Sequence, residues 1–195
     1  SSQEAKESFS SVNARKISKL LQDFKSINYD CRNRYCYDLL RLLCRSIRTI
    51  GISRAAIIIS LNLRYLKTIW KTTELTHGDF TERNIIFGID LFLIDFTEVK
   101  RSIRYLDASY IYLHNFRDLD ETTWHDDFLS DYLAGDDDLD RRLLRISFIY
   151  SALSLLCNSE MKEERKEQLD YFLLYDGFNE VWGRLSTARD FVRPG

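Results

Sequence analysis

The stretch THGDFTERNIIFGIDLFLIDFTE, residues 76–98, contains the most informative pattern in this chain. Its apolar runs at residues 84–87 and 91–94 are typical of short β-strands, and a three-residue loop that includes a glycine separates them. A short loop with glycine between two such runs predicts a β-hairpin. The sequence therefore predicts one small hairpin near the middle of the chain.

Polar residues lie at the ends of this hairpin. Asp79 precedes the first strand, Asn84 begins it, and Asp95 follows the second strand. Paired strands bring Asn84 and Asp95 to the same end, because one strand begins where the other finishes. Magnesium takes one or two carboxylates beside phosphates, so these two are candidate ligands, and Asp79 is left as a candidate base. Each residue type alone is equally typical of turns and caps, so the prediction depends on the joint pattern.

Helical periodicity surrounds the hairpin on both sides. Residues 1–50 are predicted to be helical, and Gly51 suits a helix C-terminus. Residues 53–70 form a helix with apolar side chains on nearly every side, so we expect it to be the buried central helix. Further helices are predicted at 107–117, 124–134, 138–158, 160–175 and 178–190. We expect a mainly α (α+β) single domain over residues 1–195.

Composition excludes several classes of protein. Hydrophobic residues make up 45% and charged residues 30%, as in a globular domain, and the net charge of -2 gives no reason to expect nucleic acid. The most apolar stretch, residues 55–63, is far shorter than the roughly 20 residues of a membrane span. We expect a cytoplasmic protein whose cysteines are reduced, mostly buried thiols: Cys31, Cys36, Cys44 and Cys157.

The pattern HGD, four residues, Asn, then a hydrophobic strand that ends in Asp95 resembles kinase-like phosphotransferases. It is most similar to the aminoglycoside phosphotransferase and choline kinase group, and also to lipopolysaccharide-core and RIO-type kinases, over residues 75–109. The resemblance implies the C-terminal lobe of a protein-kinase-like fold. It also implies an enzyme that uses Mg²⁺ and ATP to phosphorylate a hydroxyl of a small molecule or sugar.

The resemblance assigns roles residue by residue. It implies that Asp79 is the catalytic base and that Asn84 and Asp95 bind the metal and nucleotide. It implies that His77 braces the loop by hydrogen bonds, and that Asp107 ties the loop down through backbone amides.

Two features depart from the small-molecule kinases. Thr97 stands where these enzymes often place an acidic residue, and Glu98 comes one position later. Arg83, which we group with the residues that support the loop, is as similar to tyrosine kinases as to small-molecule kinases. An atypical protein kinase is therefore an alternative.

The small nucleotide lobe of a kinase is missing from this sequence. Residues 1–50 contain no glycine, whereas the loop that covers the phosphates needs glycine, and a strand lysine is absent as well. We expect the N-terminal lobe to come from preceding residues or a partner chain, and this chain alone to transfer phosphate poorly. A catalytically silent lobe that serves as a binding or scaffold module is the alternative from a different class.

Acidic residues concentrate between positions 118 and 140, where no Lys or Arg occurs. In the families resembled, acidic walls near the acceptor attract cationic molecules, so one interpretation of this run is a wall that attracts a cationic acceptor. The other interpretation is a solvated acidic face.

Overall fold

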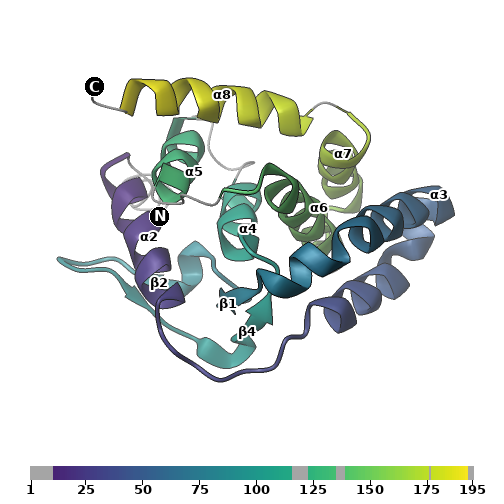
Figure 1. Cartoon of the computed structure of the whole chain (residues 1–195), viewed down its shortest axis with the longest axis horizontal. Coiled ribbons are helices and arrows are strands. Elements are labelled where there is room, and N and C mark those ends of the chain that lie inside the picture. Colours follow the sequence, from purple (N-terminus) through teal and green to yellow (C-terminus); the bar gives the residue numbers. More distant parts are fainter. Residues whose placement is uncertain (1–10, 116–122, 135–138, 176, 193–195) are drawn as a thin grey trace.

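The computed structural model describes residues 11–115, 123–134, 139–175 and 177–192. The described chain is mainly helical, as predicted, with two very small sheets (Figure 1). In chain order the elements are α2 (Ser11–Lys25), α3 (Tyr35–Lys71), β1 (Glu74–Thr76), η1 (Glu82–Asn84), β2 (Ile85–Ile86), β3 (Phe92–Leu93), η2 (Phe96–Glu98), β4 (Lys100–Ser102), α4 (Leu106–Asn115), α5 (Thr123–Ala134), α6 (Arg141–Asn158), α7 (Lys162–Leu173) and α8 (Gly177–Val192).

The helices pack in two groups that meet at α4. Helix α6 packs against α3, α4 and α7, while α5 packs against α2, α4 and α8. Helix α6 is the buried centre, because nearly every residue from Leu143 to Leu156 is inaccessible to solvent. The predicted helices after residue 107 are confirmed within a few residues, and positions 116–117 and 138 of those predictions lie outside the described part. Residues 27–34 are not helical, contrary to the prediction for the first 50 residues.

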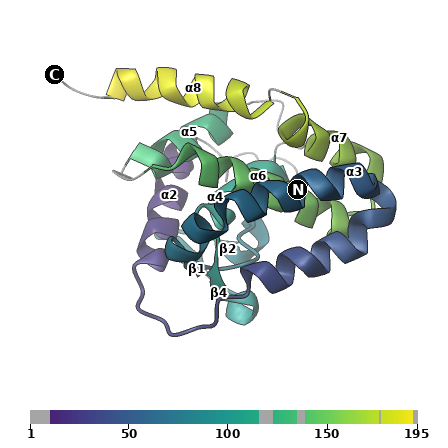
Figure 2. The ribbon, with the colours of Figure 1, turned by 45° about the vertical axis from the view of Figure 1, so that its right-hand side comes forward.

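Helix α3 bends sharply at Gly51. This glycine has φ 80° and ψ 162°, a conformation that only glycine adopts without strain. The two halves of α3 therefore double back on each other, as Figures 1 and 2 show. The hydroxyl of Tyr35 in the first half donates a hydrogen bond to the side-chain oxygen of Asn62 in the second.

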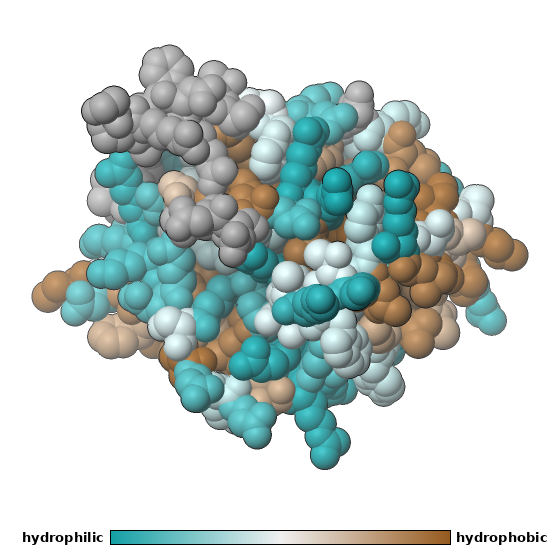
Figure 3. All heavy atoms as spheres, viewed as in Figure 1, coloured by the Kyte–Doolittle hydropathy of each residue, from teal (hydrophilic) through white to brown (hydrophobic). Residues whose placement is uncertain are grey.

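The second half of α3 is not the buried central helix that its composition predicted. Ala55, Ile58 and Ile69 are buried against the core, because α6 and α7 cover only one side of the helix. The opposite side exposes several large apolar residues: Ile52, Ile59, Leu63, Leu66 and Trp70. Hydrophobic atoms accordingly gather on the side of the space-filling view where α3 lies (Figure 3). Apolar residues on every side of a helix therefore do not determine how many other elements pack against it.

Both small sheets lie next to the predicted site. The predicted hairpin is confirmed, with Ile85 opposite Leu93 and Ile86 opposite Phe92 in antiparallel strands β2 and β3. A second pair, β1 with β4, is antiparallel with Glu74 opposite Ser102. The sequence did not predict this pair, because strands of three residues are too short to show an alternating pattern.

Two expectations from composition can be compared with the structure. Within the described ranges, no helix is long and apolar enough to cross a membrane. The four cysteines are free thiols, but Cys44 is exposed and the other three are half-buried, so they are less buried than expected.

The bend at Gly51 gives a prediction about stability. Replacing Gly51 with alanine should lower the free energy of unfolding by about 1–3 kcal/mol, because a β-carbon strains this backbone conformation. No atom lies within 4 Å of the added carbon, so the loss is backbone strain and not a clash. Gly183 within α8 is the matched control, because its neighbourhood is equally open and its φ is not positive. Gly183→Ala should instead stabilise by about 0.5–1 kcal/mol. Urea unfolding followed by circular dichroism measures both, and equal effects would contradict the prediction.

Candidate active site

The loop that contains His77, Gly78 and Asp79 is held by the carboxylate of Asp107. One oxygen of Asp107 accepts a hydrogen bond from the backbone N–H of His77 at 2.7 Å, and the other accepts from Gly78 at 3.0 Å. Asp107 lies in the first turn of α4 and is buried. Hydrogen bonds to an ionised acceptor are stronger than neutral ones, so this pair fixes the loop backbone firmly. The geometry is the one that the resemblance implies for Asp107.

Gly78 lets two segments of the site come into direct contact. Its φ of 85° favours glycine, and a β-carbon at this position would lie only 2.6 Å from the carbonyl oxygen of Glu98. The loop before Asp79 therefore passes directly against the segment after Asp95.

His77 joins the same two segments through its side chain. The imidazole is buried, and its Nε2 lies 2.9 Å from the carbonyl oxygen of Ile94. A carbonyl only accepts, so Nε2 carries the proton and donates it. Three phenylalanine rings surround the imidazole, each edge-on to it: Phe24, Phe80 and Phe96. His77 thus links the loop to the residue that precedes Asp95.

The three residues of the predicted catalytic set gather at one end of the hairpin. The Nδ2 of Asn84 donates to the backbone oxygen of Asp79 at 2.8 Å and to its carboxylate Oδ2 at 2.9 Å. The backbone oxygen of Asn84 accepts from the N–H of Ile94 at 2.9 Å. Asp95 comes next in the chain, in a left-handed conformation with φ 59°. Asn84 therefore contacts Asp79 through its side chain and lies next to the backbone that leads into Asp95.

The donor atoms that remain suit a hard cation. Because Nδ2 of Asn84 is used by Asp79, Oδ1 is free to act as a ligand. The exposed carboxylate of Asp95 accepts from the Thr97 hydroxyl through Oδ1, which leaves Oδ2. Among the described residues, no three His, Cys, Asp or Glu side chains cluster as a metal site. One carboxylate and one amide oxygen fit magnesium, which keeps most of its shell for water and phosphate.

Arg83 is the exception among the predicted site residues. Its side chain is exposed at the end of η1. In the ranges that the structure describes, it makes no hydrogen bond or ion pair that would support the loop. Its position therefore gives no basis for the expected supporting role.

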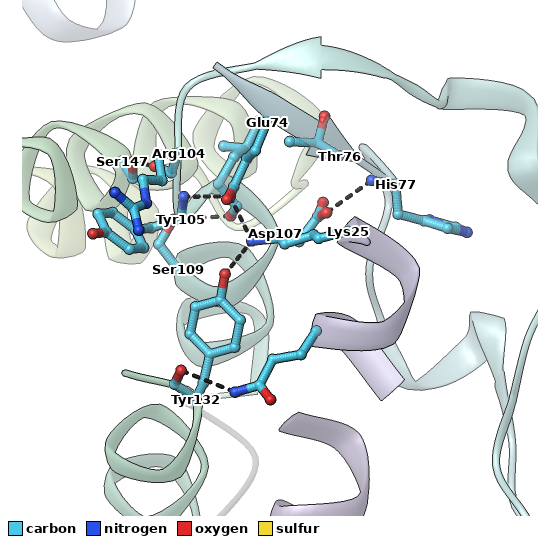
Figure 4. A network of polar contacts seen from close by, with 12 residues as sticks. Lys25, Glu74, Thr76, His77, Arg104, Tyr105, Asp107, Ser109, Tyr132 and Ser147 are labelled. Carbon is cyan, nitrogen blue, oxygen red and sulfur yellow. Dashed lines mark hydrogen bonds and ion pairs between the residues drawn. The ribbon is translucent and has the colours of Figure 1, made fainter. Parts of the chain in front are cut away.

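A second layer of contacts, which the sequence did not predict, holds the strand before the loop. Lys25 of α2 contacts the carboxylate of Glu74 in β1 and the hydroxyl of Tyr132 in α5, and Figure 4 shows the three side chains pointing toward one another. Glu74 also accepts the backbone N–H of Tyr105 at 2.6 Å. Tyr105 has φ 70°, an uncommon conformation for a bulky residue, immediately before α4. These contacts fix β1 and the start of α4 together.

Charge and burial work against each other in this layer. Burial acts to lower the pKa of Lys25, but Glu74, Tyr132 and Asp107 outweigh it, so the pKa is raised and Lys25 stays cationic. Burial raises the pKa of Glu74, although Lys25 and the N–H of Tyr105 favour the carboxylate. Lys25 and Glu74 therefore form an ion pair, and removing either residue leaves the charge of the other uncompensated.

A pocket of about 500 Å³ opens beside Asp79. The loop and η2 form one wall with Gly78, Asp79 and Glu98, and α3, β4, α4 and α6 form the rest. No described residue of the acidic run at 118–140 lines this pocket. Within that run, Asp126 pairs with Arg184 at 2.7 Å, and Asp140 caps the N-terminus of α6. Both are used structurally.

Comparison with known proteins does not identify the chain, because neither a family model nor a curated protein matches it.

The Lys25–Glu74 pair gives the first prediction for the site. Lys25→Met should lower the free energy of unfolding by roughly 1–3 kcal/mol, because it leaves the half-buried carboxylate of Glu74 without its cation. Adding Glu74→Gln to that variant should restore part of the loss, since glutamine is neutral and still accepts from Tyr105. Chemical unfolding of the two variants measures this. A double variant no more stable than Lys25→Met would show that the buried charge is not the cause.

The contacts of Asp107 give the second prediction for the site. Asp107→Asn should lower the free energy of unfolding by about 1–3 kcal/mol, because an NH₂ group replaces one of the two acceptors that face backbone N–H groups. Hydrogen exchange at the amides of His77 and Gly78 should accelerate beyond what the global loss explains. The control is Asp127→Asn on the exposed side of α5, which should stay within about 0.5 kcal/mol of the parent. Unchanged exchange at the two amides would contradict the role of Asp107.

Proposed function

We propose that this chain is the catalytic lobe of a magnesium-dependent phosphotransferase, which moves the γ-phosphate of ATP to a hydroxyl of a small molecule or sugar. The observation that carries the proposal is the gathering of Asp79, Asn84 and Asp95 at one end of the hairpin. The attachment of the loop to Asp107 supports it further, because phosphoryl transfer depends on groups held in fixed positions.

Asp79 acts as the base in this proposal. Asn84 holds one carboxylate oxygen and the backbone of Asp79, which fixes the orientation of the side chain. Asp79 also lines the pocket, so an acceptor hydroxyl in the pocket lies within reach of the carboxylate. Asp79 accepts the proton of that hydroxyl as the hydroxyl oxygen attacks the γ-phosphorus of ATP.

Asn84 and Asp95 hold the metal and, through it, the nucleotide. The oxygens concerned are Oδ1 of Asn84 and the carboxylate of Asp95. Magnesium, when bound, neutralises charge on the phosphates.

The pocket favours a small acceptor over a protein substrate. Its volume of about 500 Å³ lies within the range typical of small-molecule sites. An atypical protein kinase is the alternative within the enzymes.

The lack of glycine in residues 1–50 favours the second class of function. The described residues before the loop are helices α2 and α3, and no glycine-rich turn is present there to cover the phosphates. A catalytically silent lobe that serves as a binding module has the same architecture. In either case, this chain alone transfers phosphate poorly.

Two substitutions in the full-length protein separate the catalyst from the silent module. Asp95→Asn removes the charged ligand of the metal, so it should weaken magnesium-nucleotide binding and abolish turnover together. Asp79→Asn removes only the base, so nucleotide affinity should stay nearly constant while the rate falls by about 10²–10⁴-fold. Calorimetry with a magnesium-nucleotide complex and a phosphate-transfer assay measure the two effects.

Both variants are near-isosteric, and circular dichroism verifies that they fold. A silent module predicts that both keep full activity in a cell-based complementation test. That outcome would mean that the three residues no longer act in catalysis.

A further inference from the structure

The part of the pocket that α3 and β4 form is rich in cationic residues. Asp38, Arg41 and Arg45 line the pocket from the first half of α3, and Arg34 lines it from the position just before that helix. Their spacing of four, three and four residues places them on one face of the helix. Lys100 of β4 lines the pocket beside them.

Only part of this positive charge is compensated within the protein. Lys100 pairs with Asp38 at 2.7 Å, and Arg34 lies 4.0 Å from the same carboxylate. Arg41 makes no ion pair within the described chain, and Arg45 makes only a long contact of 3.5 Å with the carbonyl oxygen of Cys157. Two guanidinium groups therefore line the pocket without an anionic partner among the described residues.

Apart from these residues and the acidic residues of the loop wall, the lining is uncharged. Tyr110 of α4 and Tyr150, Ser154 and Asn158 of α6 also line the pocket. Burial raises the pKa of Tyr150, with Asp38 acting in the same direction, so its hydroxyl stays protonated. Groups of this kind hydrogen-bond to the hydroxyls of a polyol or sugar.

We propose that this pocket binds an acceptor that carries an anionic group, a phosphate or carboxylate, against Arg41 and Arg45, with a hydroxyl directed toward Asp79. The acceptor is then an anionic sugar or polyol and not the cationic molecule that the acidic run suggested. This inference rests on the proposed phosphotransfer, because that function supplies the reason for a hydroxyl beside Asp79. Guanidinium groups suit the anion, because their forked N–H donors match carboxylate and phosphate oxygens.

The anion site can be tested apart from catalysis. The probe is inorganic phosphate, titrated into the full-length protein without magnesium or nucleotide and compared with chloride at equal ionic strength. Arginine side-chain N–H signals in NMR spectra report the binding residue by residue. Phosphate should shift the signals of Arg41 and Arg45, and Arg41→Gln or Arg45→Gln should weaken its binding by about tenfold or more.

Arg48→Gln is the matched control. Arg48 is exposed on the same half of α3 but does not line the pocket, so its loss should change phosphate binding less than twofold. Glucose 6-phosphate should bind more tightly than phosphate, because sugar hydroxyls find partners in the pocket, whereas glucose should bind much more weakly. Equal effects of Arg41→Gln and Arg48→Gln, or equal binding of glucose and glucose 6-phosphate, would overturn the proposal.

The phosphates of the nucleotide are the other possible source of the anion. A non-hydrolysable magnesium-ATP analogue should bind together with glucose 6-phosphate if Arg41 and Arg45 hold the acceptor. Displacement of glucose 6-phosphate by the analogue would assign the site to the nucleotide and overturn the acceptor role.

Asp95→Asn distinguishes the phosphotransfer proposal from the anion-site proposal. It should weaken binding of the magnesium-ATP analogue and leave binding of inorganic phosphate unchanged. If Asp95→Asn leaves binding of the analogue unaffected while Arg41→Gln still weakens phosphate binding, the phosphotransfer proposal fails and the anion site stands.

Discussion

Two hydrogen bonds from the backbone of His77 and Gly78 to the buried carboxylate of Asp107 hold the candidate site in place. They attach a loop without regular secondary structure to the first turn of a helix that packs against the central helix α6. Asp79 follows directly, and through it Asn84 and the hairpin are positioned. These two amides bond to a side chain and not to a strand or helix, so the loop backbone at His77 and Gly78 depends on Asp107. The chemistry proposed here therefore relies on a residue that does not touch the substrate.

The surrounding structure positions Asp107 in turn. Glu74 accepts the N–H of Tyr105 two residues earlier, and Lys25 connects Glu74 to α5. Polar groups in a poorly solvated region interact more strongly than in water, so a complete network is rigid while an incomplete one is unstable. The same rigidity serves the pocket. Its acidic wall belongs to the held loop and its cationic wall to α3, so the two are kept apart at a fixed separation.

Local patterns allowed part of this to be predicted. The hairpin, the order of Asp79, Asn84 and Asp95, and the later helices are each encoded within short stretches, so spacing was sufficient. The contribution of Lys25 to a loop about fifty residues later has no local pattern, and neither does the pairing of β1 with β4. The exposure of the second half of α3 could not be predicted either, because apolar residues on all sides of a helix do not show which sides pack against other helices. The pocket arginines were missed for a related reason: their spacing is helical, but only the fold turns them toward Asp79.

The residues that support the candidate site lie far apart in the sequence, which has a consequence for synthesis on the ribosome. A nascent chain that has emerged as far as residue 98 already contains every proposed catalytic residue, but it lacks Asp107 and Tyr132. The loop cannot be held until α4 has emerged, and Lys25 cannot complete its contacts until α5 follows. Until then, the charges of Lys25 and Glu74 lack their full surroundings, and the exposed apolar side of α3 adds to the surface available for wrong contacts. The order in which the chain emerges therefore places the period of greatest risk of misfolding between synthesis of the hairpin and arrival of α5.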